Sequence, residues 1–375
     1  MFTTIKARIA SLFGRGSGED AGADEGEGRG EEQSQAGDSA ATYESDDSSP
    51  IVRILLSVLA FITLFIVVLG VFWSFEPDQF SVVENREQKL AGSDNAPVIG
   101  AASTAALIGV AETLLDKPGG YLSNDVMVPG IYLDNIPNWE FGVLVQVRDF
   151  ARAFRESFSR SQSQSQEDLD LREAEPLFNF DNASWMFPAT EREYRKAIDL
   201  FSSYLQRIGD PADADAQFFA RADNLAGWLL TVESRLGSLS QRLSASVGQE
   251  RVNTDIAGEP GAAQSTRVAR EARVKTPWLQ VDDVFYEARG TTWALVHFLR
   301  AVEIDFGDVL ADKNATASLE QIIRDLEYSQ RTVFFPVILN GSGFGIFANH
   351  SLTMANYVSR ANAAIIDLRN LLAQG

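Results

Sequence analysis

Acidic and imidazole side chains recur at helical spacing in the segment that begins at Val281. Asp283 and Glu287 are one turn apart, and His297 follows on the same stripe, about 15 Å further along a helix. A positioned carboxylate or imidazole can act as a general acid or base. The stripe also carries small residues that would let a ligand or another helix approach closely, namely Gly290, Ala294 and Ala301.

Two interpretations of this stripe remain open. In the first, Asp283, Glu287 and His297, with His350 from a later segment, line a polar cleft in which His297 is the acid or base. In the second, the small residues serve close helix packing, and His297 is hydrogen-bonded at a helix interface. We favour the second interpretation.

A glycine-rich segment precedes His350. It follows the apolar run VFFPVIL, lies in a stretch without charged residues from Thr332 to Ser359, and leads into an expected helix. A strand, a glycine loop and a helix together outline a phosphate-binding loop, but the dinucleotide spacing and a Gly-Lys-Ser/Thr ending are missing. We favour a tight turn, and as another reading an apolar loop that binds a partner or a membrane. The candidate binding residues are Asn340, Gly341, Gly343, Phe344 and Gly345.

Composition excludes several function classes. The 375 residues include 52 acids and 32 bases, a net charge of −20, which repels nucleic-acid phosphates. The absence of cysteine excludes disulfides, thiolate zinc sites and cysteine nucleophiles. With two histidines, a three-histidine metal site is also excluded, and we expect no metal and no cofactor.

The chain contains one segment typical of a membrane span. Ile54 to Trp73 carries no charge over 20 residues, which as a helix is about as long as a bilayer core is thick. We therefore predict a transmembrane helix within 50–75. A basic N-terminus, acids just after the span and the lack of cysteine favour a cytoplasmic N-terminus, with residues 76–375 outside the cytoplasm.

The residues before the span divide into two parts. Residues 1–15 place apolar side chains at helical spacing with only basic charges, which indicates either an amphipathic helix on an anionic membrane or a frayed terminus. Residues 16–49 are rich in Gly, Ser and acids and too poor in apolar residues to fold, so we expect a disordered acidic tail.

The periodicity of apolar residues predicts that residues 76–375 form an all-α domain. We expect a bundle of antiparallel helical hairpins with long loops. A heptad line from Ala222 to Leu243 and a matching one from Tyr194 to Ile208 predict an antiparallel hairpin over 190–247. Long connections at 161–175 and 248–276 suggest sub-bundles 97–247 and 277–375. The remaining expected elements are helices over 97–117, 138–160, 281–305, 318–330 and 351–373, and a strand over 333–339.

Several phrases of the sequence are specific rather than compositional. They are FWSFEPDQF, GGYLSNDVMVPGIYLDNIPNWEFGVLVQVRDFARAF, FSRSQSQSQEDLDL and TPWLQVDDVFYEARGTTWALVHFLRA. Together they resemble the bacterial domain-of-unknown-function family 2333, over nearly the whole chain after residue 50. The resemblance implies a Gram-negative envelope protein with one membrane span, and it implies no activity and no catalytic residues. With the favoured orientation, we expect a bacterial inner-membrane protein whose residues 76–375 lie in the periplasm.

These observations favour a non-enzymatic membrane protein whose all-α domain binds or scaffolds cell-envelope components. The partner would be an envelope protein or a second copy, bound through helical seams. The alternative is an enzyme that acts on an envelope polymer such as peptidoglycan, with carboxylates near Glu287 as its acid and base.

Overall fold

The structure, a computed structural model, describes residues 50–91, 98–161, 167–210, 215–252, 271–333 and 337–374. Within the described part, helices predominate and residues Leu56–Gly375 form one compact unit. The predicted all-α fold is therefore confirmed. The segments expected to form an amphipathic helix, 1–15, and an acidic tail, 16–49, lie outside the described residues.

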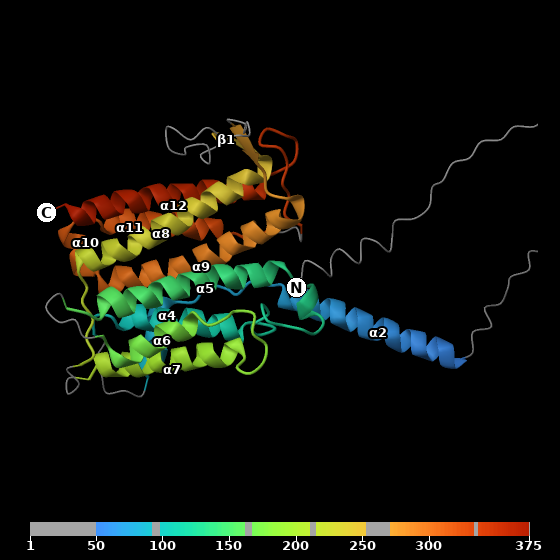
Figure 1. The fold of residues 1–375 in the computed structure, drawn as a ribbon, viewed down its shortest axis with the longest axis horizontal. Helices are drawn as coiled ribbons and strands as arrows, with labels where there is room; N and C mark the ends of the chain where they lie inside the picture. Colours follow the sequence, from blue (N-terminus) through green and yellow to red (C-terminus); the bar gives the residue numbers. More distant parts are fainter. Residues whose placement is uncertain are drawn as a thin grey trace, which may run out of the picture. The chain divides into compact units, whose positions relative to one another are not determined.

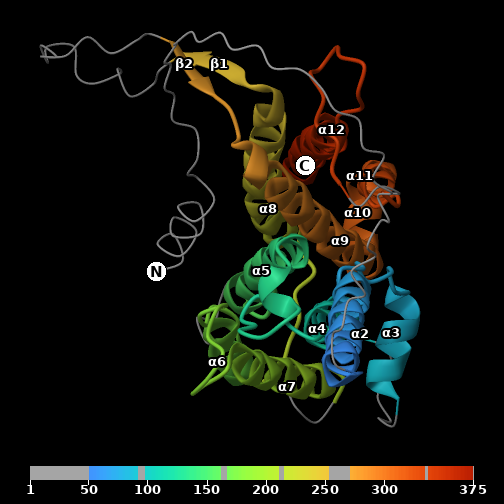
Figure 2. The same cartoon turned by 90° about the vertical axis from the view of Figure 1, so that its right-hand side faces the viewer.

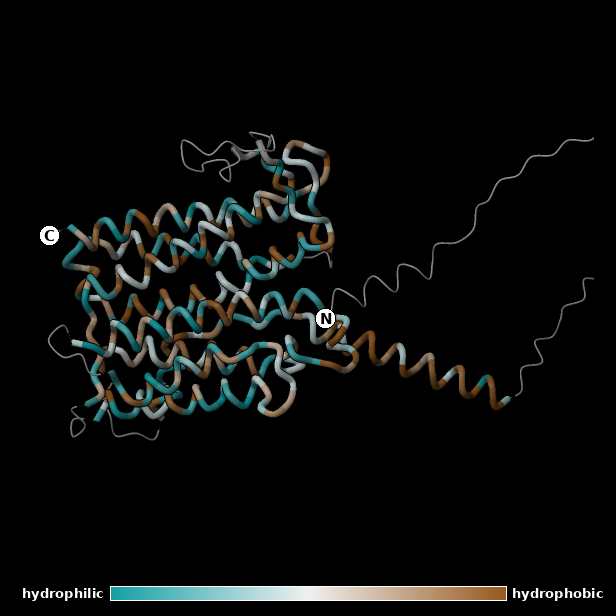
Figure 3. The backbone as a smooth tube through the Cα atoms, in the orientation of Figure 1, coloured by the Kyte–Doolittle hydropathy of each residue, from teal (hydrophilic) through white to brown (hydrophobic). Residues whose placement is uncertain are grey.

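The N-terminal element is helix α2, Pro50–Trp73, which contains the predicted apolar span. It is long and apolar enough to cross a membrane, and Gly70 is its one buried residue. Figure 3 shows it as a nearly continuous hydrophobic tube. A helix that leaves so many large apolar side chains exposed needs another apolar environment to cover them.

The helices of the domain fall into two groups that meet along α5 and α9 (Figures 1 and 2). One group comprises α4, α6 and α7 with α5, and the other comprises α8, α11 and α12 with α9. The bounds are α3 Val82–Leu90, α4 Ala101–Asp116, α5 Asn135–Ala153 continued by a π-helical turn Phe154–Phe158, α6 Leu169–Phe178, α7 Thr190–Ile208, α8 Ala222–Ser244, α9 Val281–Asp305, α10 Gly307–Asp312, α11 Thr316–Ser329 and α12 His350–Ala373.

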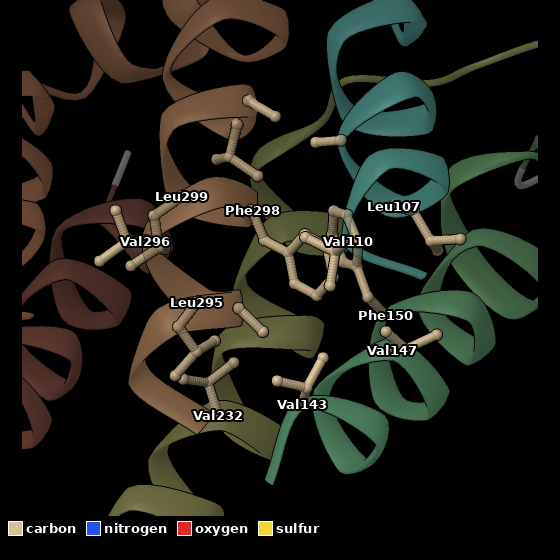
Figure 4. Close-up of a cluster of buried hydrophobic side chains, with 14 of the residues drawn as sticks. Leu107, Val110, Val143, Val147, Phe150, Val232, Leu295, Val296, Phe298 and Leu299 are labelled. Atoms are coloured by element: carbon tan, nitrogen blue, oxygen red, sulfur yellow. The ribbon is translucent and has the colours of Figure 1, made fainter. Parts of the chain in front are cut away.

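The core is densest where α5 and α9 pack together (Figure 4). Phe150 of α5 stacks on Phe298 of α9, with ring centroids 4.4 Å apart, and both rings are fully buried. Near the starts of the two helices, Asn138 bonds to Asp283. This bond lies near the start of both helices, and the stack of Phe150 on Phe298 lies further along both. The two helices therefore run parallel, with their N-termini at the same end of the domain.

The heptad line of α8 packs against a partner that the sequence did not predict. α8 lies along α12, antiparallel to it, since Glu233 pairs with Arg369 while Gly237 faces Asn362. α7 packs instead on α6 and α4. The predicted hairpin over 190–247 is therefore wrong, because each heptad line fixes a seam but not its partner. The division into sub-bundles 97–247 and 277–375 stays a prediction.

Three local predictions also need correction. Residues 337–339 and 332–333 are not in a strand, and Asn340 makes only an isolated bridge to Asn349. The acidic run expected as a loop contains α6, which begins after the N-cap Asp168. The connection at 248–276 holds a short antiparallel pair, β1 Gln249–Val252 and β2 Glu271–Val274.

Candidate functional site

Helix α5 packs directly on the α9 stripe at Gly290. A Cβ atom on Gly290 would lie 1.9 Å from the carbonyl oxygen of Trp139, and one on Gly142 would lie 2.1 Å from the carbonyl oxygen of Glu287. The backbones of the two helices thus touch at two glycines, one on each helix. Because a helix occupies this face, the space beside Gly290 is not open to a ligand.

His297 lies at the centre of an aromatic cluster. Its ring is fully buried and stacks on Phe80, with centroids 4.0 Å apart, and Trp293 lies 4.3 Å away on the same helix. The backbone N–H of Phe80 donates to Nε2 at 3.1 Å, so Nε2 carries no proton. Nδ1 therefore carries the proton and donates to the carbonyl oxygen of Trp293 at 2.7 Å.

The electrostatic surroundings of His297 favour its neutral form. Burial lowers the pKa of His297 from 6.5 to about 4, with a smaller lowering from the Arg300 charge and an opposing effect of the bond to Trp293. At neutral pH the imidazole is uncharged and both of its nitrogens are engaged. This histidine is suited to holding the segment after α2, rather than to exchanging protons with a substrate.

The two carboxylates of the stripe bind neighbouring helices. Glu287 forms an ion pair with Arg242 of α8, with one bond of 2.8 Å, and Asp283 accepts a bond of 2.8 Å from Asn138 of α5. Both side chains remain partly exposed. They join α9 to its neighbours on either side, and their exposed edges remain accessible to solvent.

His350 begins helix α12 and closes the glycine-rich loop. Its backbone N–H donates to the carbonyl oxygen of Leu339 at 2.8 Å, and its Nδ1 accepts from the N–H of Leu339 at 3.2 Å. The N–H of Gly341 donates to Ala348, and that of Gly345 to Ser342. The loop is therefore a closed turn, while its Phe344 side chain is fully exposed.

The four candidate cleft residues do not form one site. His350 lies near the first turns of α9, with its ring 6.4 Å from the ring of Phe285, while Asp283 and Glu287 contact α5 and α8. His297 is about three helical turns away and buried. Among the residues that the structure describes, no group of three or more His, Asp or Glu side chains could hold a metal ion.

Sequence reasoning missed an ion pair between Glu76, just after α2, and Arg289 of α9. Arg289 Nε lies 2.6 and 2.8 Å from the two carboxylate oxygens, and both side chains are largely buried. The same guanidinium donates to the carbonyl oxygens of Ser329 and Arg331 at the end of α11. A charge so soon after the span, in FWSFEPDQF, was the available signal.

A second missed network orders the loop between α4 and α5. Glu140, completely buried in α5, pairs with Lys117 and accepts 2.8 Å bonds from the N–H groups of Leu122 and Ser123. Burial raises the pKa of Glu140, while Lys117 and the hydrogen bonds oppose that change. The loop after α4 is thereby fixed to the start of α5.

These contacts define a class of protein: an all-α domain whose first segment joins it, through Glu76 and Phe80, to a single helix long enough to span a membrane. The chain belongs to a family of uncharacterized proteins conserved in bacteria, DUF2333, which matches residues 47–375. The resemblance seen in the sequence phrases is thus confirmed. No curated protein and no solved structure shows a significant match.

Proposed function

We propose that this chain is a non-enzymatic, single-pass protein of the bacterial inner membrane whose all-α domain binds or scaffolds cell-envelope components. One observation carries this proposal: α5 packs directly on the stripe at Gly290, and the His297 of that stripe is buried and neutral. The imidazole suited to acid–base chemistry near neutral pH thus holds the fold together. The domain is left with binding surfaces.

The location belongs to the same proposal. Residues 76–375 face the periplasm and the N-terminus faces the cytoplasm, with α2 as the span between them. The exposed apolar surface of α2, the acids after it and the lack of cysteine support this arrangement. The partner is an envelope protein or a second copy of the chain.

The alternative is an enzyme acting on an envelope polymer such as peptidoglycan. It is favoured by one observation, the partly exposed carboxylates of Asp283 and Glu287 one turn apart near the start of α9. Against it, each carboxylate already has a protein partner, Asn138 or Arg242. A general acid in this position would have to leave that partner.

Substitution separates the two candidates. We expect a strain lacking the gene to be complemented equally well by wild type, Glu287→Gln and Asp283→Asn. A matched control is Glu233→Gln, which changes another interhelical pair, with Arg369. If Glu287→Gln failed to complement while the control Glu233→Gln did, and the thermal stability of both was unchanged, the result would favour the enzyme and contradict the scaffold.

Topology is tested separately, with a protease-sensitive tag after Gly375 in osmotically opened cells. Cleavage of the tag without detergent is the expected result. Protection until the membrane is dissolved would put the domain in the cytoplasm and overturn the periplasmic assignment.

A further inference from the structure

The loop between α4 and α5 lies against the last turns of α2. A Cβ atom on Gly119 would come within 2.8 Å of the Trp73 ring, and one on Gly70 would lie 3.3 Å from Pro129. Trp is enriched where a spanning helix leaves the bilayer. If Trp73 marks that depth, the loop beside it lies at the membrane surface.

The loop before α7 is at the same end of the domain. The side-chain amide of Asn124 donates to the carbonyl oxygen of Ser184 at 2.9 Å, and the Tyr121 hydroxyl donates to that of Asn182 at 3.1 Å. Both donors belong to the loop that contacts Trp73. The two loops therefore form one continuous surface.

The loops before α9 and α12 complete this end, which faces the viewer in Figure 2. The bond between Asn138 and Asp283 places the start of α9 beside the start of α5. The ring contact between His350 and Phe285 places the start of α12 there too. Four loops from separate parts of the sequence thus lie at the end of the domain where α2 stops.

These loops carry the most exposed large apolar side chains of the described chain. Eight such side chains are exposed by 72% to 109%, more than any in α2 itself, and all eight lie in the four loops. We call this set the apolar rim. Its members are Met127, Tyr132, Phe187, Trp278, Leu279, Phe344, Ile346 and Phe347.

The loop tips are also free of charge. The segments 126–133, 182–189, 276–281 and 337–349 contain no Asp, Glu, Lys or Arg, although 22% of the whole chain is charged. Without basic residues at the tips, attraction to anionic headgroups is not the basis of contact. The Phe, Ile, Leu and Met side chains of the rim are suited to the acyl region just below the headgroups. Tyr132 and Trp278, which carry one polar group on an apolar ring, are suited to the boundary with the headgroups.

We propose that the apolar rim inserts into the bilayer that α2 crosses, so that the domain is attached to the membrane by four loop tips as well as by α2. The proposal rests on α2 being a membrane span, as in the proposed function. It holds for either orientation of the chain, because the rim and Trp73 lie on the same side of the membrane in both. The ligand is the lipid surface itself.

Single-cysteine spin labels test this directly, because the native chain has no cysteine. The full-length protein is reconstituted in vesicles of phosphatidylcholine, which carry no net charge. Collisions of the label with oxygen and with a water-soluble nickel complex are then measured for four variants. They are Phe344→Cys and Phe187→Cys in the rim, Phe61→Cys in the span, and Leu230→Cys, an exposed apolar position on the flank of α8.

We expect the rim labels to resemble the label at Phe61, with several-fold fewer nickel collisions than the label at Leu230 and more oxygen collisions. The difference should persist at high salt. If the rim labels collided with nickel as often as the label at Leu230, while the label at Phe61 was in lipid, the rim would not be inserted. That result would contradict this proposal and leave the membrane span of α2 intact. Rim labels shielded from both reagents would indicate contact between copies and also overturn it. Frequent nickel collisions of the label at Phe61 would contradict the membrane span of α2, and with it the insertion of the rim.

Discussion

The backbone N–H of Phe80 donates a hydrogen bond of 3.1 Å to Nε2 of His297, 217 positions later in the chain. With the ion pair between Glu76 and Arg289, it fastens the segment after α2 to the central helix of the domain. The domain is thereby held on the chain from Glu76 onward, three residues after the end of α2.

The neutral state of His297 gives the protein a pH-dependent stability. The pKa of His297 is about 4 in the folded chain and 6.5 in the unfolded one, so below pH 6.5 the unfolded state binds a proton that the folded state does not. The free energy of unfolding should therefore fall between pH 6.5 and about 4, by on the order of 3 kcal/mol. Urea unfolding of the detergent-solubilised chain, followed by circular dichroism from pH 7.5 to 4, measures it. His297→Gln should flatten this slope, and an unchanged slope in that variant would assign it to other groups.

The pair between Glu76 and Arg289 should be costly to break from either side. Arg289→Met leaves a largely buried carboxylate, and Glu76→Gln leaves a largely buried guanidinium. Removing one partner of a buried pair costs about 3–5 kcal/mol, whereas an exposed pair contributes about 0–1 kcal/mol. The control is Arg324→Met, which breaks an exposed pair with Glu320. If the midpoint of thermal unfolding changed equally in all three variants, the buried pair would contribute no more stability than the exposed one.

The close approach of α5 and α9 should make Gly290 intolerant of a side chain. Gly290→Ala would place a Cβ atom 1.9 Å from a carbonyl oxygen of α5, so the helices must separate and unfolding should become easier by about 1–3 kcal/mol or more. The matched control is Gly227→Ala in α8, where a Cβ atom meets nothing within 4 Å. That substitution should stabilise by up to about 1 kcal/mol, because alanine is the better helix former. Chemical denaturation would show the two changes as opposite in sign, and equal effects would contradict the packing.

Local sequence determined the elements with the strongest periodicity. The apolar run before Trp73 is a helix, and the helix predicted over 281–305 has those bounds, because spacing within one helix depends on near neighbours alone. The helix predicted over 138–160 is formed by α5 and the π-helical turn after it, and its apolar side chains from Val143 to Phe158 are buried on one face. The family resemblance, too, was present in the phrases of the sequence.

Only the tertiary structure decided which surfaces meet. The heptad line of α8 packs on α12 and not on α7. An apolar seam can pack on any complementary seam, so the order of the helices along the chain does not identify its partner. Glu76 and Arg289 form a pair that no spacing rule predicts, since long-range contacts depend on how all the helices pack. The same packing buries His297 against Phe80 and brings four loops with uncharged tips to the end of the domain where α2 stops. The sequence showed the small residues and the histidine on one stripe, and the fold decided that α5 lies against Gly290 and that Phe80 lies against His297.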